Sequence, residues 1–208
     1  VKSLDASNDR IVYEQGGYLH LLDPQTGQAK QLIINVQGDF TWALPRWQDV
    51  RPGALLNASL SPTGKRALFE YRGDIFTVPK ENGDWRNLSH SSGVADRSPA
   101  WSPDGQKIAW FSDAGGEYQL VISNQEGLEK PRTIALPNPT FYFRPQWSPD
   151  SKHIAYTDTD YNLWVVNVES GQPKKVDTER YAHPNRSLNP VWSPDSKWVA
   201  YARLLDNQ

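Results

Sequence analysis

The chain contains 208 residues, and its 22 Lys and Arg nearly balance its 24 Asp and Glu, so the formal net charge is -2. This mixed, near-neutral charge excludes the basic surface typical of nucleic-acid-binding proteins, and the lack of cysteine excludes disulfides and thiolate chemistry. No apolar run approaches the ~18 residues of a membrane-spanning helix, so neither a nucleic acid nor a membrane is an expected partner.

The sequence contains no methionine, not even an initiator. We therefore expect the chain to be a processed product or a piece excised from a longer polypeptide. Nine Trp, nine Tyr and six Phe offset a modest hydrophobic share of 38%, because large aromatic side chains supply core volume. The composition predicts one sizeable domain with an aromatic-rich core.

A short phrase recurs along the chain. "SPAWSPDGQKIAWFSD" at 98–113 returns in close form at 145–158 and 190–203, and in looser form at 58–71 and 2–15. The residue before the Ser-Pro pair or its equivalent is, in chain order, Leu4, Leu60, Trp101, Trp147 and Trp192, at intervals of 56, 41, 46 and 45 residues. A period of about 40 to 50 residues, rich in short strands, is typical of four-stranded propeller blades.

The repeat predicts an all-β fold. We expect a partial β-propeller whose blades have four antiparallel strands each, with about four blades and the start of a fifth. The units are residues 1–56, 57–97, 98–143, 144–188 and an incomplete 189–208. The first unit is the longest, and we place its excess in "VQGDFTWALPRWQDVRPG" at 36–53.

The unit at 98–143 shows how each copy divides. Ser102 to Gly105 have the residue preferences of a type I turn, with Pro second and Gly fourth. The strand before this turn ends at Trp101, and strands are predicted after it at 108–111, 118–123 and 132–136. In the next unit the strands are expected near 146–147, 153–157, 162–168 and 174–177. No segment shows the periodicity of an amphipathic helix.

Residues 57–122 also contain motifs that do not recur: "RALFE-x-RG-[DE]-IF-x-VP", "RNL", "GVA-[DE]-R" and "SD-x-x-GEY-x-L". The recurring phrase resembles the repeat of TolB-like propellers, and these motifs resemble the N-terminal propeller of tricorn protease and its bacterial homologues. The resemblance implies a propeller joined, in the parent polypeptide, to further domains and a serine-peptidase core. In that family propellers govern the passage of peptides to and from a separate catalytic site. No catalytic residue carries over, because the motif of that core does not occur in this chain.

The residues themselves also argue against catalysis. Nucleophilic serine chemistry needs a serine, a base and an orienting group, and the chain has no Gly-x-Ser-x-Gly motif. Its four histidines, His20, His90, His153 and His183, stand at unlike positions of different repeats. We therefore expect no catalytic residue and no cofactor in this chain.

One segment has the ligand spacing of a calcium loop. Asp158, Asp160, Asn162 and Glu169 match positions 1, 3, 5 and 12 of an EF-hand. Position 6, which should be Gly, is Leu163, and "NLWVVNV" is needed as a strand. A hairpin turn accommodates "DTDYN" without an ion, so no metal is expected.

The tryptophans fall into two groups. Trp101, Trp147 and Trp192 occupy equivalent repeat positions and are expected to pack between neighbouring blades. Trp42, Arg46 and Trp47 lie in the excess segment of the first unit, and Trp and Arg are the residue types of interface hot spots. We consider two roles for this segment, an interface with a partner or domain and an ordinary packed loop.

A polar residue precedes each turn phrase by three positions. These residues are Asn57, Ser98, Arg144 and Asn189, and Arg97 stands beside Ser98. Because the first strand of each blade lines the central channel of a propeller, we expect their side chains to converge there. Arg and Asn could hold peptide carbonyls or a terminal carboxylate; otherwise they would cap strand ends or bind water.

The leading functional hypothesis is a non-catalytic propeller segment of a tricorn-like serine peptidase, serving peptide gating or domain association. Its expected partners are peptides or a protein partner and the remaining domains of the parent chain. The alternative is a TolB-like envelope propeller that acts as a protein-protein interaction scaffold. An enzyme with its site in the channel ranks last, because the chain offers no acid/base pair. A periplasmic location is expected, although the resemblance also allows the cytoplasm.

Overall fold

A computed structural model describes residues 2–44, 49–180 and 188–203. The chain divides into two compact units, Val1–Gln48 and Asp49–Gln208. The described residues form β-strands and no α-helix; two short 3₁₀ helices, η1 (Thr41–Ala43) and η2 (Pro52–Ala54), lie in the segment that follows the first sheet.

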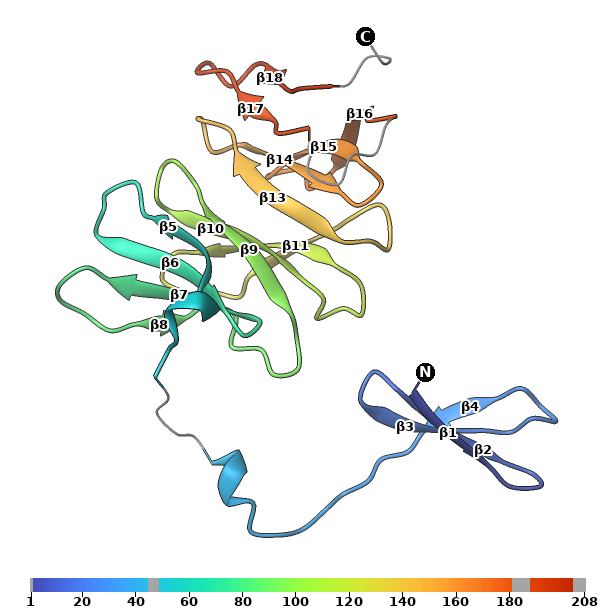
Figure 1. Cartoon of the computed structure of the whole chain (residues 1–208). Helices are drawn as coiled ribbons and strands as arrows, with labels where there is room; N and C mark the ends of the chain where they lie inside the picture. The colour runs from blue at the N-terminus through green and yellow to red at the C-terminus, as the bar shows by residue number, and fades with distance from the viewer. Residues whose placement is uncertain (1, 45–48, 181–187, 204–208) are drawn as a thin grey trace. The chain divides into compact units, whose positions relative to one another are not determined.

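The first unit holds one antiparallel sheet of four strands in chain order (Figure 1). These strands are β1 (Lys2–Ala6), β2 (Ile11–Gln15), β3 (Tyr18–Leu22) and β4 (Ala29–Gln31). Sequential antiparallel strands joined by short turns are the pattern of a propeller blade.

The second unit repeats this sheet three times and begins it once more. The strands are β5 (Leu56–Leu60), β6 (Arg66–Tyr71), β7 (Asp74–Pro79) and β8 (Arg86–Asn87), then β9 (Asp96–Trp101), β10 (Lys107–Ser112), β11 (Gln119–Asn124) and β12 (Arg132–Ala135), then β13 (Tyr142–Trp147), β14 (His153–Asp158), β15 (Asn162–Asn167) and β16 (Pro173–Thr178), and finally β17 (Val191–Trp192) and β18 (Val199–Ala200). The all-β prediction with four-stranded antiparallel blades is confirmed, and the propeller is partial.

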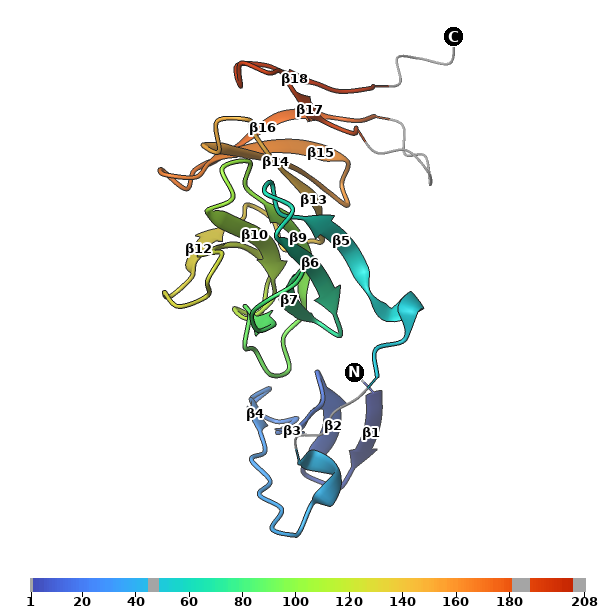
Figure 2. The ribbon, with the colours of Figure 1, turned by 90° about the vertical axis from the view of Figure 1, so that its left-hand side faces the viewer.

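Within the second unit, successive blades stack with their first strands next to one another. Strand β9 packs against both β5 and β13, and Figures 1 and 2 show these three strands side by side in two views. The first strand of each blade therefore lies on the inner side of the stack, as expected for a propeller.

The recurring turn is held by its own side chains. The Gly105 N–H donates to the Ser102 carbonyl over 2.9 Å, and Gly105 has a left-handed φ of +71° that suits glycine. The Ser102 hydroxyl accepts from the Lys107 N–H at 2.9 Å, and the Asp104 carboxylate accepts from the Gln106 N–H at 2.9 Å. Ser, Asp and Gly thus each satisfy a specific backbone requirement of this turn.

The repeat tryptophans join one blade to the previous one, as predicted. Trp147 is buried and its indole N–H donates to the Ala100 carbonyl at 3.1 Å. The indole N–H of Trp192 donates in the same way to the Gln146 carbonyl at 3.0 Å. Trp101 packs against the buried cluster that contains Leu68 and Ile75 of the preceding blade.

Aromatic rings form the core between the blades β9–β12 and β13–β16. Phe111, Tyr142 and Tyr156 lie with ring centroids 5.6 to 5.8 Å apart, in the same buried cluster as Leu120 and Ile154. Burial of side chains of this size stabilises the fold by about 1.5–3 kcal/mol each. This confirms the aromatic-rich core that the composition predicts.

The register of the first sheet corrects one alignment. The sequence alignment matched Leu4 with Leu60. In the structure Ala6 is the equivalent of Leu60, because each is the last paired residue before its turn: Ala6 pairs with Ile11, and Leu60 pairs with Ala67. The reason is a shorter turn. In the first sheet the Ser7 N–H donates to the carbonyl of Arg10, three residues later, whereas in the second blade the Ser61 N–H donates to the carbonyl of Arg66, five residues later. The equivalent positions of the first sheet therefore lie two residues later than the sequence alignment placed them.

Candidate functional site

Each inner strand carries a β-bulge at the same place. The pairing register shifts between Leu56 and Ser59 in β5, between Arg97 and Ala100 in β9, and between Phe143 and Gln146 in β13. A bulge leaves a residue out of the ladder and re-aims its side chain, and bulges are over-represented next to active sites.

The predicted polar residues are the bulge residues. Their backbones are left-handed, with φ of +50° for Asn57, +53° for Ser98, +51° for Arg144 and +42° for Asn189, the equivalent residue before β17. Left-handed conformations are uncommon for residues other than glycine, cost on the order of 1–3 kcal/mol, and cluster at functional sites. The sequence therefore places costly conformations at one repeated position.

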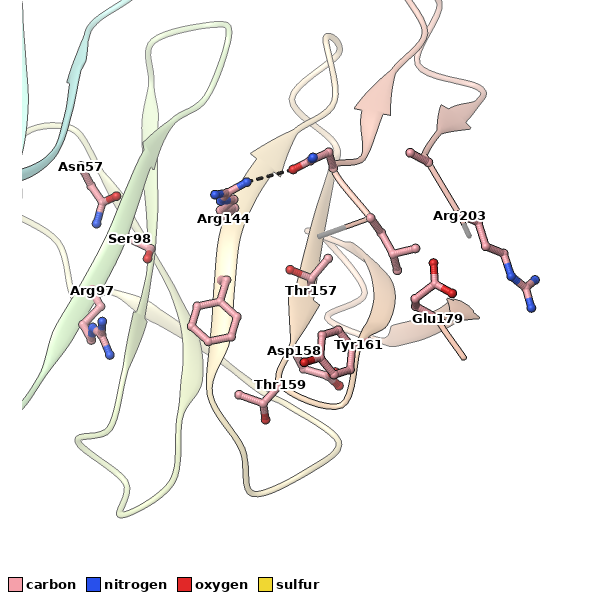
Figure 3. Close-up of a pocket in the computed structure, with 14 residues that line it drawn as sticks. Asn57, Arg97, Ser98, Arg144, Thr157, Asp158, Thr159, Tyr161, Glu179 and Arg203 are labelled. Carbon is pink, nitrogen blue, oxygen red and sulfur yellow. Dashed lines mark hydrogen bonds between the residues drawn. The ribbon is translucent and has the colours of Figure 1, made fainter. Parts of the chain in front are cut away.

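These residues converge on one hollow of about 760 Å³, here called the inner-strand pocket (Figure 3). In a regular strand two adjacent side chains point to opposite faces. Because of the bulge, both members of three adjacent pairs line this pocket. The pairs are Arg97 with Ser98, Phe143 with Arg144, and Leu188 with Asn189.

The predicted convergence of Asn57, Arg97, Ser98, Arg144 and Asn189 on one site is thus seen in the structure. A role for these residues in binding stays a prediction. Trp42 belongs to the other compact unit, where it is 72% exposed and its ring lies edge-on to that of Phe40. Arg46 and Trp47 lie outside the described residues, so their predicted interface role also stays a prediction.

Three hydrogen bonds organise the pocket wall. Glu70 of β6 is 5% exposed, and one of its oxygens accepts from the Asn57 amide at 2.6 Å and from the Ser98 N–H at 2.8 Å. The Arg144 guanidinium donates to the Asn189 side-chain oxygen at 2.9 Å, as Figure 3 shows. The Glu70–Ser98 and Arg144–Asn189 hydrogen bonds join neighbouring blades, so the pocket geometry depends on the stacking of the blades.

Further lining residues come from the hairpin that joins β14 and β15, in the same blade as Arg144. Thr157, Asp158, Thr159 and Tyr161 lie there, and Glu179 and Arg203 complete the rim (Figure 3). The sequence analysis did not assign these residues to the channel. Thr157 could have been found, because it pairs with Phe143 across the sheet at the position next to the bulge.

Asp158 uses both oxygens within its own hairpin. One oxygen accepts from the N–H groups of Asp160 and Asn162 at 3.0 and 2.9 Å. The other accepts from the Asn162 amide and the Trp164 indole, both at 2.8 Å. Asp158, Asp160 and Asn162 thus lie in a hairpin turn held by N–H donors, whereas Glu169 follows the far end of β15. No group of three or more His, Cys, Asp or Glu side chains in the described ranges is placed to hold a metal ion.

Arg203 at the rim also pairs with Asp177 at 3.0 Å, and the Tyr201 hydroxyl donates to the same carboxylate at 2.9 Å. The Thr178 N–H, followed by Tyr201 and Arg203, lowers the pKa of Asp177 below its ordinary value. The hydrogen bond to Asp177 raises the pKa of Tyr201. Of these three residues only Arg203 lines the pocket, and its guanidinium is paired with Asp177.

A second hollow, of about 500 Å³, lies at the other ends of the strands. Lys107, Lys152 and Arg132 are among its lining residues. Arg132 donates to the carbonyls of Val168 and Glu169 at 2.6 and 2.7 Å, and so ties two blades together.

No helix among the described residues is long and apolar enough to cross a membrane.

Curated relatives share part of their length with this chain. Dipeptidyl-peptidase 5 of Porphyromonas gingivalis is 28% identical over 159 residues, which is 72% of this chain and 22% of the relative. A tricorn protease homolog of Saccharolobus solfataricus is 28% identical over 190 residues, or 87% of this chain and 17% of the relative. The chain thus spans about a fifth of the length of these two proteins.

Solved structures show the same fold. The tricorn protease structure superposes with a TM-score of 0.57 at 16% identity, covering 99% of this chain and 19% of that one. TolB from Acinetobacter baumannii superposes with a TM-score of 0.54 at 20% identity, covering 96% of this chain and 47% of that one. At these identities the likeness concerns the fold alone.

A family model decides membership. The model of the tricorn protease second beta propeller domain matches residues 55–208, which include all the blades of the second unit. The motifs in the sequence pointed to tricorn propellers, and the model names the second propeller where the motifs suggested the N-terminal one. The chain belongs to the family of the tricorn protease second beta propeller domain.

Proposed function

We propose that the chain binds a peptide segment in the inner-strand pocket and has no catalytic role of its own. The observation that carries the proposal is the repeated bulge, which brings Asn57, Arg97 and Arg144 to one hollow from three blades. An amide offers both a donor and an acceptor, and a guanidinium offers several donors. Such groups suit peptide carbonyls and a terminal carboxylate, as expected from the sequence.

The chemistry of the pocket supports binding over hydrolysis. The described residues that line it include Ser98 but neither His nor Lys, and a serine nucleophile needs an adjacent base. The Ser98 N–H is already used by Glu70 at 2.8 Å. Bidentate and charge-assisted contacts from arginine, in contrast, are among the stronger ways to hold a carboxylate.

The parent polypeptide supplies the rest of the proposal. The chain covers about a fifth of relatives whose names describe a dipeptidyl-peptidase and a tricorn protease homolog. We therefore propose that peptide gating, or association with the remaining domains, is the contribution of this propeller to a peptidase in the parent protein. A periplasmic location is part of the same proposal.

Two assays on the purified chain test it. A labelled octapeptide with a photoreactive group should crosslink to β5, β9 or β13, and unlabelled peptide should compete with it. Fluorogenic peptides should stay intact, and turnover abolished by a serine-directed inhibitor would refute the non-catalytic role. Crosslinks confined to the second hollow, around Lys107 and Lys152, would refute the site.

A protein-binding scaffold of the TolB type is the second candidate. The observation in its favour is the 72% exposed Trp42, with Ile33 and Leu44 also exposed on the same segment. Sequencing the parent reading frame on both sides of the chain separates the two functions. A serine-peptidase core favours the first, and a propeller without one favours the scaffold.

A further inference from the structure

Glu70 is a buried carboxylate that contacts two blades at once. It lies on β6 and is 5% exposed. One oxygen accepts from the Asn57 amide at 2.6 Å and from the Ser98 N–H at 2.8 Å, and the other lies 3.9 Å from the Arg97 Nε. Asn57 belongs to the same blade as Glu70, whereas Arg97 and Ser98 belong to the next.

Within the second unit the position of Glu70 is repeated, but its charge is not; in the first sheet Glu14 occupies this position, opposite Lys2 and beside the bulge at Ser3. Glu70 pairs with Leu56 across the sheet, Phe111 pairs with Arg97, and Thr157 pairs with Phe143. All three therefore stand opposite the residue before the bulge. Phe111 packs against Tyr142 and Tyr156 in the core, so an aromatic ring at this position is enough for stacking the blades. Stacking of the blades therefore does not explain why a carboxylate stands at position 70.

We propose that Glu70 is a positioning residue for the inner-strand pocket. The inference rests on the proposed peptide-binding function and names a residue that sets the geometry of its site. Glu70 does not line the pocket itself, while its three partners Asn57, Arg97 and Ser98 do. It acts through those partners.

The physical argument starts from the cost of burying a charge. A buried carboxylate is stable only when it is hydrogen-bonded or paired. Glu70 accepts hydrogen bonds from two bulge residues and forms an ion pair with the Arg97 guanidinium. Charge-assisted hydrogen bonds are shorter and about twice as strong as neutral ones. The two hydrogen bonds therefore fix the Asn57 side chain and the Ser98 backbone relative to one another across the boundary between two blades, and the ion pair attracts the Arg97 guanidinium to the same carboxylate.

Two substitutions separate these contacts. In Glu70→Gln the amide oxygen can still accept from Asn57 and Ser98, but an NH₂ group then faces Arg97. In Glu70→Ala all three contacts are lost. If Glu70 positions the site, Glu70→Gln should weaken peptide binding as Arg97→Ala does, and Glu70→Ala should weaken it further.

The experiment combines a structural and a binding readout on the full chain. Amide exchange of Ser98, followed by NMR, should be unchanged in Glu70→Gln and at least about tenfold faster in Glu70→Ala. Anisotropy of a fluorescein-labelled Ala/Ser octapeptide with a free carboxyl terminus should report a Kd about tenfold weaker for Glu70→Gln. Adding Arg97→Ala to Glu70→Gln should weaken binding no further.

The control is Thr77→Val in the same blade. Thr77 is fully buried and its hydroxyl accepts from Arg66 at 3.0 Å, away from the pocket. This variant should lose stability and keep its peptide affinity and its Ser98 exchange.

The outcomes distinguish the positioning role of Glu70 from the proposed peptide-binding function. Wild-type Kd values retained in both Glu70 variants, or unchanged Ser98 exchange in Glu70→Ala, would overturn the role of Glu70. Absence of peptide binding to the wild-type chain, with Ser98 exchange as expected, would overturn the proposed function while leaving the contact between Glu70 and the bulges established.

Discussion

The guanidinium of Arg144 donates a 2.9 Å hydrogen bond to the side-chain oxygen of Asn189, and so connects the equivalent residues of two successive blades. Both residues have a left-handed backbone, with φ of +51° and +42°. The strained position and the polar contact occur together, which is the combination expected where a fold presents side chains for recognition rather than for packing.

Strain at the bulge predicts a gain in stability when it is relieved. Ser98 has φ of +53° and no side-chain hydrogen bond among those described, while its N–H is held by Glu70. Replacing Ser98 by Gly should raise the free energy of unfolding by about 1 kcal/mol, because glycine adopts this conformation without the steric cost. Urea unfolding measures the change. Ser98→Ala is the matched control and should show no such gain, and equal stability of the two variants would contradict the strain argument.

The two buried tyrosines of the core should respond in opposite ways to loss of the hydroxyl. Tyr156 is wholly buried, and its hydroxyl has no partner among the described residues. Tyr142 donates to the Asn138 carbonyl at 2.8 Å and accepts from the Asn138 N–H at 3.0 Å. Tyr156→Phe should be neutral or stabilising, because an unpaired buried polar group costs about 1–3 kcal/mol. Tyr142→Phe should lose about 1 kcal/mol.

Thermal and urea unfolding of these two variants provide the measurement. A loss of more than about 1 kcal/mol in Tyr156→Phe would show that its hydroxyl is satisfied by an ordered water or another group.

Trp147 should contribute strongly to the stacking of the blades. It is 7% exposed, and its indole donates to the Ala100 carbonyl of the preceding blade at 3.1 Å. Trp147→Phe removes this donor and leaves a cavity, so a loss of about 2–3 kcal/mol is expected. Leu60 occupies the equivalent position in the second blade but is 70% exposed, so Leu60→Ala should cost much less stability. Equal losses in Trp147→Phe and Leu60→Ala, measured by urea unfolding, would contradict this ranking.

The recurring turn predicts a dependence of stability on pH. Hydrogen bonds from the Ser148 hydroxyl and then from the Lys152 N–H lower the pKa of Asp150 below 3.8 in the folded chain. A lowered folded pKa gives stability that is present above the unfolded pKa and lost as the pH falls through the folded pKa. The urea midpoint should therefore fall between pH 5 and pH 2.5.

Asp150→Asn tests the source of this dependence. The amide oxygen can still accept both hydrogen bonds but does not titrate, so the midpoint of the variant should fall less steeply with pH. Asp195 has the same contacts with Ser193 and Lys197, and its pKa is also lowered. Asp195→Asn should behave alike, and slopes equal to that of the wild type in both variants would exclude the turn aspartates as the cause.

Much of this fold could be predicted from the sequence because each blade repeats the same local chemistry. The "WSPDG" phrase specifies a turn, and Trp147 and Trp192 occupy the blade boundary that the repeat implies. The first sheet was misaligned by two residues because its turn, "SNDR", lacks the proline and the length of the others. Local sequence signals therefore worked where the turn kept its residues and failed where it did not.

The candidate site could be predicted in part for a related reason. Asn57, Ser98, Arg144 and Asn189 share a spacing from the turn, so the repeat placed them together. Glu70 was not found in this way, because its equivalents in the next two blades are Phe111 and Thr157 and its partners come from two blades. Glu14, which stands at the same position opposite Lys2, is the repeat signal that could have pointed to it. The bulge that re-aims these side chains has no residue signature in the sequence and shows only in the pairing register.

The central claim is that the inner-strand pocket binds peptide through the bulge residues, and one titration tests it most directly. Anisotropy of the labelled octapeptide should give a Kd at least about tenfold weaker for Arg144→Ala than for the wild type. Lys152→Ala, in the second hollow, should leave the Kd unchanged. The account predicts this difference between the two variants, and equal affinity of Arg144→Ala and the wild-type chain would contradict it.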